Sequence, residues 1–361
     1  MGYDGDRVQS FLRKFIAACH AQLAAALASI HDQAPVSYLR ARGLAERPLL
    51  ERFDVGYFEE LPMHGTTSPM VADLEREYSD ILPFLTKHSH ARQSLDSAGR
   101  GAIPCIYGPA GNFLFRRRLI FPIYGIDGSV LNVYGRTIEE DSPFKHLYGS
   151  ARWNWYNIGR PEIASAKALV LTESIVDALT FVHCGIPTVT SLCAGPYRYG
   201  PNIAHDQRVE FMNAGLVEQL KEQTGVHTIY ICFDKDANFA GDIQAVSLAK
   251  ILAESGFDVK LLHLPPNEDP NSLFTKSGDT QSQRRARFLD YFTDMMGGAG
   301  DFIMEEALLE LERLNLNQVQ MRAVRQLLAA VGQYYSRSDE RLFDVTVERR
   351  ADVRDAPRER E

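Results

Sequence analysis

Four carboxylates follow the ends of two apolar segments. The run KALVLT ends at Glu173, and Asp177 comes four residues later. The run VHTIYICF ends at Asp234, and Asp236 follows after a single lysine. Alternate residues that leave a strand point the same way, so Asp234 and Asp236 can share one site. If both runs are strands of one parallel sheet, all four side chains come to the edge where such sheets bind ligands.

Several carboxylates in one site require cations, because like charges ~4 Å apart repel strongly in a partly dry environment. Oxygen ligands favour Mg²⁺ or Mn²⁺ over zinc, and such ions can activate an attacking oxygen and neutralise a leaving pyrophosphate. The competing interpretation is an acidic strand end that caps a helix N-terminus. A D-x-D pair alone would favour the cap, but a glutamate one α/β unit earlier favours a metal site formed by Glu173, Asp234 and Asp236.

The segment that carries these acids alternates between strand and helix. Strands are predicted for KALVLTE, PTVTSL, VHTIYICF and FDVKLLHL. Helices are predicted for SIVDALTFVHC, which stops at Gly185, and for GDIQAVSLAKILAES, which stops near Gly256. This alternation is typical of an α/β fold with a parallel sheet and covering helices. We assign residues 166–278 to this core.

The flanking segments have other patterns. Residues 8–31 have helical periodicity, and a second helical region is interrupted at Gly43. LIFPIYGI and SVLNVYGR predict a β-hairpin that turns at Asp127-Gly128. Residues 1–165 are therefore predicted to form an α+β subdomain and residues 279–345 a helical subdomain. Residues 346–361 are nearly all charged and are predicted to be disordered.

Composition excludes several classes of protein. The 361 residues are 45% hydrophobic and 24% charged, which is ordinary for a folded protein. The formal charge is −8, so contact with nucleic acid must depend on a local basic patch. No apolar run approaches the roughly 20 residues that span a bilayer, so no membrane partner is expected. The five scattered cysteines indicate neither a zinc ribbon nor a disulfide framework, and the expected location is the cytoplasm.

Three motifs resemble, in order and spacing, the TOPRIM signature of bacterial replicative (DnaG-type) DNA primases. They are L-T-E-S-I-V-D, C-F-D-K-D-A-N-F-A-G and L-P-P-N-E-D-P-N-S-L. Upstream, Y-L-R-A-R-G-L with F-D-V-G-Y is similar to the start of the primase RNA-polymerase domain. F-R-R-R-L-I-F-P-I, G-R-T-I and S-P-F-K-H-L are similar to its basic subdomain. The resemblance covers roughly residues 20–275.

This resemblance implies a DNA-templated RNA polymerase that makes short primers on single-stranded DNA from ribonucleoside triphosphates. Glu173, Asp234 and Asp236 would hold the catalytic Mg²⁺ or Mn²⁺ ions, with Asp177 and Asp269 as supporting acids. The TOPRIM core would lie between the N-terminal basic subdomain and the C-terminal helical one. In such proteins the metals promote nucleotidyl transfer in DNA replication.

Basic residues would line the groove for template and triphosphates: Arg116, Arg118, Arg136, Lys145 and, near a further basic position of the family, Arg152. Strand alternation puts Arg116 and Arg118 on one face and Arg117 on the other; the competing interpretation is a solvated strand edge. Aromatic side chains could stack on bases, although core packing is the favoured role for Tyr134, Trp153, Trp155 and Tyr156.

The chain departs from the family pattern at several points. It has no N-terminal cysteine-histidine cluster for a zinc domain, so no zinc is expected. Asn271 replaces the second acid of D-P-D, Ser174 replaces the glycine after the glutamate, and two extra residues precede Gly241. A zinc-free primase suggests a mobile element. It also suggests a helicase or a separate template-recognition protein as partner.

Two other functions use the same core. A TOPRIM nuclease would cleave nucleic acid with the same metals, and a non-catalytic subunit would only bind it. The upstream basic half favours a primase over a nuclease, because cleavage needs no triphosphate site. The intact carboxylates favour an enzyme over a binding subunit.

Overall fold

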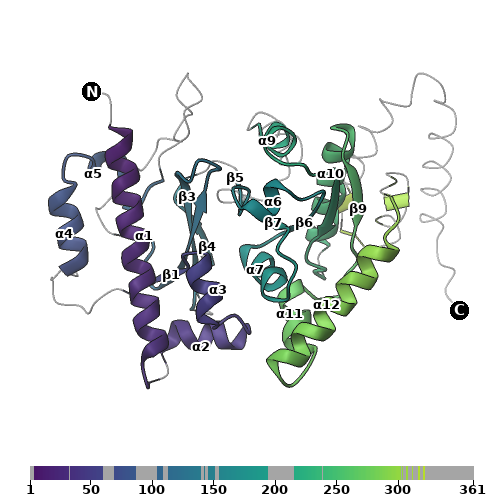
Figure 1. The fold of residues 1–361 in the computed structure, drawn as a ribbon, viewed down its shortest axis with the longest axis horizontal. Coiled ribbons are helices and arrows are strands. Elements are labelled where there is room, and N and C mark those ends of the chain that lie inside the picture. Colours follow the sequence, from purple (N-terminus) through teal and green to yellow (C-terminus); the bar gives the residue numbers. More distant parts are fainter. Residues whose placement is uncertain are drawn as a thin grey trace, which may run out of the picture.

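The computed structural model describes residues 4–31, 33–59, 69–86, 104–108, 113–139, 142, 145–150, 154–193, 215–237, 239–301, 303, 306–307, 311, 316–317 and 320–321. These residues form two sheets with their covering helices (Figure 1). The first sheet lies in the N-terminal half, and the second lies in the segment that carries the acidic motifs.

The first sheet is antiparallel, in the order β1-β2-β3-β4. Its strands are β1 (Gly56–Phe58), β2 (Arg118–Tyr124), β3 (Val130–Thr137) and β4 (His146–Tyr148). Asp127-Gly128 forms the β2–β3 turn, where Gly128 has a φ of +74° that glycine tolerates without strain. The hairpin predicted from the sequence is confirmed.

Helices pack on both sides of this sheet. They are α1 (Gly5–Ala28), α2 (Ala34–Ala41), α3 (Arg47–Arg52), α4 (Pro69–Glu77) and α5 (Leu82–Leu85). The Asp4 side chain caps α1 by accepting from the main-chain N–H groups of Asp6 and Arg7. Phe11 and Phe15 lie one turn apart on the buried face of α1, where they meet Ile120 and Val133 of the sheet in one apolar cluster.

The second sheet has the order β5-β7-β6-β8-β9. Its strands are β5 (Asn154–Trp155), β6 (Ala168–Thr172), β7 (Val189–Cys193), β8 (Thr228–Cys232) and β9 (Asp258–Leu261). The predicted parallel α/β core is confirmed, because β6, β7, β8 and β9 pair in parallel. The antiparallel edge strand β5 was not predicted, since two residues are too short to show a periodic pattern.

The helices of this second part are α6 (Pro161–Ala164), α7 (Ile175–His183), α9 (Leu216–Gln223), α10 (Ala240–Glu254), α11 (Pro270–Lys276) and α12 (Gln281–Gly298). Strand alternation divides the apolar side chains between the two faces of the sheet. Val170 joins the cluster around α7, whereas Leu169 and Leu171 join the cluster that contains Leu248 and Leu252 of α10. The sheet therefore lies between α7 and α10.

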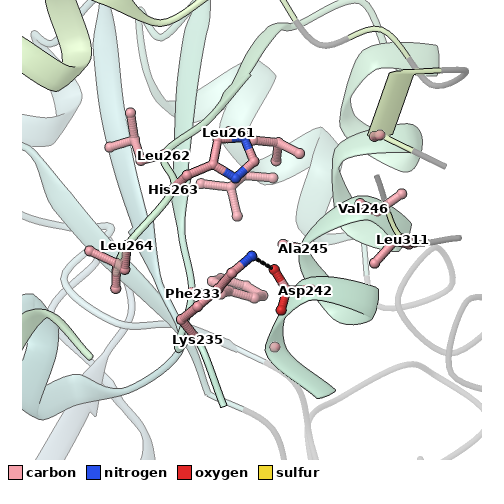
Figure 2. A pocket seen from close by; sticks show the side chains of 13 residues that line it. Phe233, Lys235, Asp242, Ala245, Val246, Leu261, Leu262, His263, Leu264 and Leu311 are labelled. Atoms are coloured by element: carbon pink, nitrogen blue, oxygen red, sulfur yellow. Dashed lines mark hydrogen bonds and ion pairs between the residues drawn. The ribbon is translucent and has the colours of Figure 1, made fainter. Parts of the chain in front are cut away.

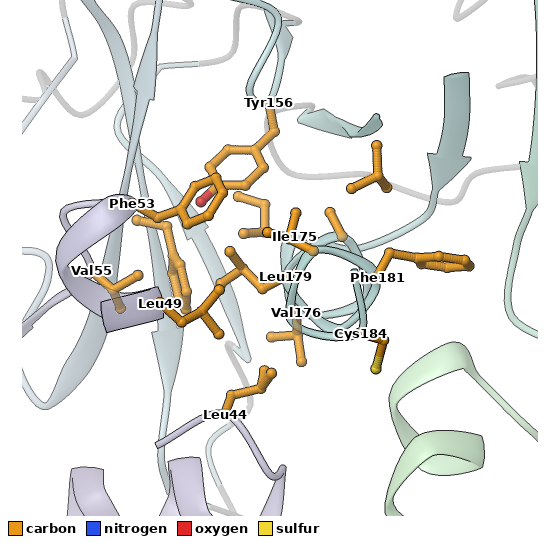
Figure 3. Packing of buried hydrophobic residues seen from close by; sticks show 14 of the residues in the cluster. Leu44, Leu49, Phe53, Val55, Tyr156, Ile175, Val176, Leu179, Phe181 and Cys184 are labelled. Atoms are coloured by element: carbon orange, nitrogen blue, oxygen red, sulfur yellow. The ribbon is translucent and has the colours of Figure 1, made fainter. Parts of the chain in front are cut away.

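A shared apolar core joins the two parts of the protein. Leu49 and Phe53 of the α3 region pack with Val176 and Leu179 of α7 (Figure 3). The same cluster includes Phe121 and Tyr134 of the first sheet and Phe288 and Phe292 of α12. This continuous packing fixes the N-terminal sheet beside the strand ends that carry the acidic residues.

The proposed divisions at 165/166 and 278/279 stay predictions. Helix α12 lies in the predicted C-terminal helical subdomain, of which only scattered residues beyond 301 are described. The tail at 346–361 lies outside the described residues. In the described part of the chain, no helix combines the length and the apolar character needed to cross a membrane.

Candidate active site

Two half-buried carboxylates lie at the ends of adjacent parallel strands. Glu173 directly follows β6, and Asp234 lies two residues beyond β8, whose Cys232 is in register with Thr172. Oε2 of Glu173 and Oδ1 of Asp234 are both buried and have no hydrogen-bond partner among the described residues. A buried acceptor without a donor costs free energy, so these two atoms are suited to bind a cation or a proton.

The electrostatics of this pair support the same conclusion. Burial and the negative charge of Asp236 raise the pKa of Glu173. Burial and the negative charges of Asp177 and Glu173 raise the pKa of Asp234. Both carboxylates therefore favour protonation when no cation neutralises them.

Asp177 and Asp269 differ from this pair because their oxygens have donors. Asp177 accepts from the hydroxyl of Ser174 and, over 3.0 Å, from the main-chain N–H of Asn271. Asp269 caps α11 by accepting from the main-chain N–H of Ser272 over 2.6 Å. Burial and the charge of Asp269 raise the pKa of Asp177. Both acids thus lie close to the site while holding the ends of α7 and α11.

The donor set fits a hard cation such as Mg²⁺ or Mn²⁺. The unpartnered oxygens belong to carboxylates, and Asp236 adds an exposed carboxylate two residues after Asp234. No group of three or more His, Cys, Asp or Glu residues converges on one metal position within the described ranges. The site is an acidic cluster with two oxygens available to a cation rather than a complete coordination sphere.

Gly241 makes this close approach possible. A Cβ at this position would lie 2.1 Å from the carbonyl oxygen of Asp234 and 3.3 Å from Oε2 of Glu173. The first turn of α10 therefore packs directly against the segment that follows β8, and only glycine fits there. Phe239, which directly precedes α10, has a φ of +57° and is the N-cap residue of that helix.

Residues 170–274 match the family model described as Toprim-like. The chain contains a Toprim-like domain. The match begins within β6 and ends within α11, so it includes all five acids. It confirms the TOPRIM core expected from the sequence motifs.

The chain is also similar to bacterial DNA primases. It is 23% identical to the DNA primase of Clostridium acetobutylicum over 67% of this chain and 35% of that protein. It is 25% identical to the DNA primase of Geobacillus stearothermophilus over 68% of this chain and 36% of that protein. The chain thus spans about a third of the length of these relatives.

Solved primase structures share the fold. The RNA polymerase domain of Mycobacterium tuberculosis primase DnaG, in complex with double-stranded DNA, superposes with a TM-score of 0.54 and 19% identity over 96% of each chain. A DnaG catalytic domain bound to single-stranded DNA superposes with a TM-score of 0.53 and 18% identity over 90% of this chain and 92% of that one. The likeness therefore extends beyond the Toprim-like domain to the N-terminal half.

The expected arrangement of the three consecutive arginines is wrong. Strand β2 begins only at Arg118, and Arg117, with a φ of +53°, lies in the turn before it. Alternation therefore does not relate Arg116 to Arg118: Arg116 is exposed, whereas Arg118 is buried. Arg117 is exposed, as expected, and pairs with Glu139 over 2.6 Å.

Arg118 and Arg136 lie on opposite faces of the first sheet. Arg118 is opposite Thr137, and Arg136 is opposite Leu119, so their side chains leave the sheet on different sides. The Arg118 guanidinium donates to the carbonyl oxygens of Gly135 and Lys145 at 3.5 and 3.3 Å. The structure therefore does not bring Arg118 and Arg136 together on one face.

The other predicted basic and aromatic residues divide into three groups. Arg136 and the exposed Lys145 lie at the ends of β3 and β4. Arg152 and Trp153 lie outside the described residues. The favoured packing role fits the remaining aromatic residues, since all three are buried in apolar clusters: Tyr134, Trp155 and Tyr156.

An apolar pocket of about 270 Å³ borders α10 and β9, and Figure 2 shows the side chains that line it. Gly241 lines this pocket and also packs against Asp234, so the pocket lies beside the acidic site. Phe233, Leu262 and Leu264 line it, and the ion pair between Lys235 and Asp242 lies at one side. The carboxylates of Glu173 and Asp234 do not line this pocket. Its apolar walls make it unsuited to a triphosphate.

The sequence did not reveal two positioning residues. Asn271 is buried and links α11 to α7 and to the turn after α2. Ser174 caps α7 by accepting from the main-chain N–H of Asp177. Both had been treated only as departures from a family pattern, although a serine directly before an apolar helical segment is an N-cap signal.

Proposed function

We propose that this protein is a primase-like, DNA-templated RNA polymerase that synthesises short primers on single-stranded DNA. The unpartnered oxygens of Glu173 and Asp234 carry the proposal, since they offer a cation site on the fold of a primase catalytic core. The similarity to DNA primases supports nucleotidyl transfer as the reaction. The raised pKa values of these acids support a site that needs positive charge to become ionised.

Three carboxylates would hold the metal ions: Glu173, Asp234 and Asp236. When bound, Mg²⁺ or Mn²⁺ supplies the charge that activates the attacking hydroxyl and neutralises the leaving pyrophosphate. Asp177 and Asp269 would support the site indirectly, because their hydrogen bonds hold the first turns of α7 and α11 around it. Gly241 keeps the first turn of α10 against the end of β8, so that Glu173 and Asp234 stay close to each other.

The substrates follow from the same proposal. Template phosphates and ribonucleoside triphosphates would meet the basic residues Arg136, Lys145, Arg116 and Arg152, whose side chains suit phosphate oxygens. We assign Arg118 a structural role. The reaction would take place in the cytoplasm, and a helicase or a separate template-recognition protein would assist initiation.

The decisive experiment is synthesis from single-stranded DNA, labelled ribonucleoside triphosphates and Mg²⁺ or Mn²⁺. We expect short labelled products that depend on the template and the metal. Asp234→Asn should abolish them. Asp258→Asn makes the same chemical change at the start of β9, the opposite end of the sheet, and should leave synthesis intact. Template cleavage without synthesis would instead identify a nuclease, and binding without either reaction would identify a non-catalytic subunit.

A further inference from the structure

Arg136 and His146 form a cross-strand pair at the edge of the first sheet. They are direct partners in the β3–β4 register, so their side chains lie on the same face. Nη1 of Arg136 lies 2.7 Å from Nε2 of His146. The hydroxyl of Tyr134, on the same face of β3, lies 2.8 Å from Nδ1 of His146. Both nitrogens of the ring are thus engaged.

These contacts determine the state of the imidazole. A guanidinium has only donors, so Nε2 of His146 must accept the hydrogen bond from Arg136. The ring is then neutral, carries its hydrogen on Nδ1, and donates it to Tyr134. Partial burial, and the positive charges of Arg136 and Lys145, lower the pKa of His146 to about 4, which agrees with this state.

Neutrality distinguishes this pair from the ion pair that Arg117 forms at the same end of the sheet. Arg117 pairs with the carboxylate of Glu139 over 2.6 Å, so much of its charge is neutralised. Among the residues that the structure describes, Arg136 has no carboxylate partner; its neighbours are His146, Tyr134 and Tyr38. Lys145, next to His146, is exposed and likewise has no ion pair within the described ranges.

We propose that His146 is a positioning residue that holds the Arg136 guanidinium as a neutral acceptor and leaves its full charge for a phosphate group. An acidic residue would hold the arginine equally well but would cancel the charge that binds the ligand. This inference rests on the proposed function, because the phosphate would belong to the template strand or to a nucleoside triphosphate.

Three substitutions at position 146 test the proposal. His146→Gln keeps a neutral acceptor, His146→Ala removes the acceptor, and His146→Glu adds a negative charge. Affinity for a fluorescent single-stranded oligonucleotide and for a fluorescent ATP analogue is measured at several salt concentrations. Arg136→Ala serves as the reference for complete loss of the contact, and melting temperatures show whether each variant is folded.

We expect His146→Gln to bind within about twofold of the wild type. His146→Glu should match Arg136→Ala, with at least fivefold weaker binding. If Arg136 binds the template, both variants should lower the salt slope for the oligonucleotide by about 0.7, the value for one phosphate contact on a single strand. If it binds a triphosphate, the loss should appear with the ATP analogue alone. The affinity of His146→Ala should lie between those of His146→Gln and His146→Glu. In a protein that already carries Arg136→Ala, His146→Ala should have no further effect on affinity.

Two results would overturn the role of His146. The first is equal affinity of His146→Glu and His146→Gln for both probes. The second is weaker binding by the His146 variants at an unchanged salt slope, together with a lower melting temperature, because this combination indicates a purely structural residue. Failure of the proposed function has a different signature, since wild-type protein that binds both probes but makes no primer leaves the positioning role standing. A wild type that binds neither probe would overturn both.

Discussion

The main-chain N–H of Asn271 donates a hydrogen bond to Oδ1 of Asp177 over 3.0 Å. The Asn271 side chain continues this connection, since Nδ2 donates to the carbonyl oxygen of Arg42 and to the hydroxyl of Thr180, each over 2.9 Å. Nη1 of Arg42 in turn donates a hydrogen bond to Oδ1 of Asn271 over 3.2 Å. One buried asparagine thus ties α11 to α7, which carries an acid of the site, and to the N-terminal part.

We expect Asn271→Asp to destabilise the protein by about 3 kcal/mol, even though it restores the acid of the family pattern. The aspartate loses both Nδ2 donor bonds, and a buried polar group left without its partner costs about 1–3 kcal/mol. It also adds negative charge beside Asp177. Urea denaturation measures the change. The control is Asn267→Asp, at an exposed position before α11, which should hardly change the free energy of unfolding. A stable Asn271→Asp variant with higher activity would instead assign position 271 to metal binding.

Asp234→Asn should raise the melting temperature of the metal-free protein by about 2–5 °C, because the carboxyl must take up a proton on folding next to Asp177 and Glu173, whereas the amide is already neutral. Mg²⁺ should raise the melting temperature of the wild type and have little effect on the variant, since a ligand stabilises only the state that binds it. Thermal melts with and without Mg²⁺ measure both effects. If Mg²⁺ stabilises Asp234→Asn as much as the wild type, the cation binds elsewhere.

Stability of the metal-free protein should fall as pH rises above 6.5. Glu173 and Asp234 have folded pKa values above those of the unfolded chain, so the folded state binds more protons and loses stability as the pH rises through the folded values. His183 has the opposite effect at lower pH. Burial and the charge of Arg285 lower its pKa to about 4, so its contribution is lost only as pH falls below ~6.5.

Denaturation between pH 6.5 and 8 therefore separates the carboxylates from the buried thiols of Cys19, Cys184 and Cys232, whose raised pKa values lower stability only at higher pH. Asp234→Asn should show a flatter pH profile than the wild type in this range, and saturating Mg²⁺ should flatten the wild-type profile. Parallel profiles for wild type and variant would show that Asp234 ionises in the folded protein as it does in the unfolded chain.

Arg118→Ala should reduce stability rather than alter the charge of the binding surface. Its buried guanidinium donates to the carbonyl oxygens of Gly135 and Lys145, so we expect a loss of about 2 kcal/mol with an unchanged salt slope for DNA binding. Arg117→Ala removes an exposed ion pair and should cost less than about 1 kcal/mol. Urea denaturation and salt titrations separate the two effects, and a lower salt slope for Arg118→Ala would return this residue to the phosphate-binding surface.

The parallel core could be predicted because its signals are local. Alternating strands and helices, with glycines such as Gly185 after a helix, predict a parallel sheet, and the sheet alone brings Glu173 and Asp234 to the same edge. The arrangement of Arg118 could not be predicted in this way. Arg117 has a left-handed backbone conformation, and β2 begins at the next residue. The alternation of side chains in the sequence does not indicate such a change in the backbone.

The role of Asn271 depends on contacts across long stretches of sequence. Its partners Arg42 and Thr180 lie 229 and 91 residues away, so no local pattern reports them. A motif comparison could identify the position but not the use that the chain makes of it. The pairing of His146 with Arg136 could not be predicted from local sequence either, because it depends on the register between β3 and β4.

Gly241→Ala should abolish primer synthesis and destabilise the protein, because the added methyl group would lie 2.1 Å from the carbonyl oxygen of Asp234. That oxygen belongs to the main chain, so relief requires α10 or the end of β8 to move, and either shift separates Glu173 from Asp234. Such overpacking costs about 1–3 kcal/mol. The measurements are urea denaturation and primer synthesis at increasing Mg²⁺.

The matched control is Gly297→Ala, in the last turn of α12, where an added Cβ meets no atom within 4 Å. Alanine is favoured over glycine by about 1 kcal/mol within a helix, so this control should be neutral or slightly stabilised and should retain synthesis. If excess Mg²⁺ restores synthesis by Gly241→Ala, the clash has only weakened metal binding. Wild-type activity and stability for Gly241→Ala would show that α10 can withdraw from β8 without cost, and that the close approach is not needed for the site.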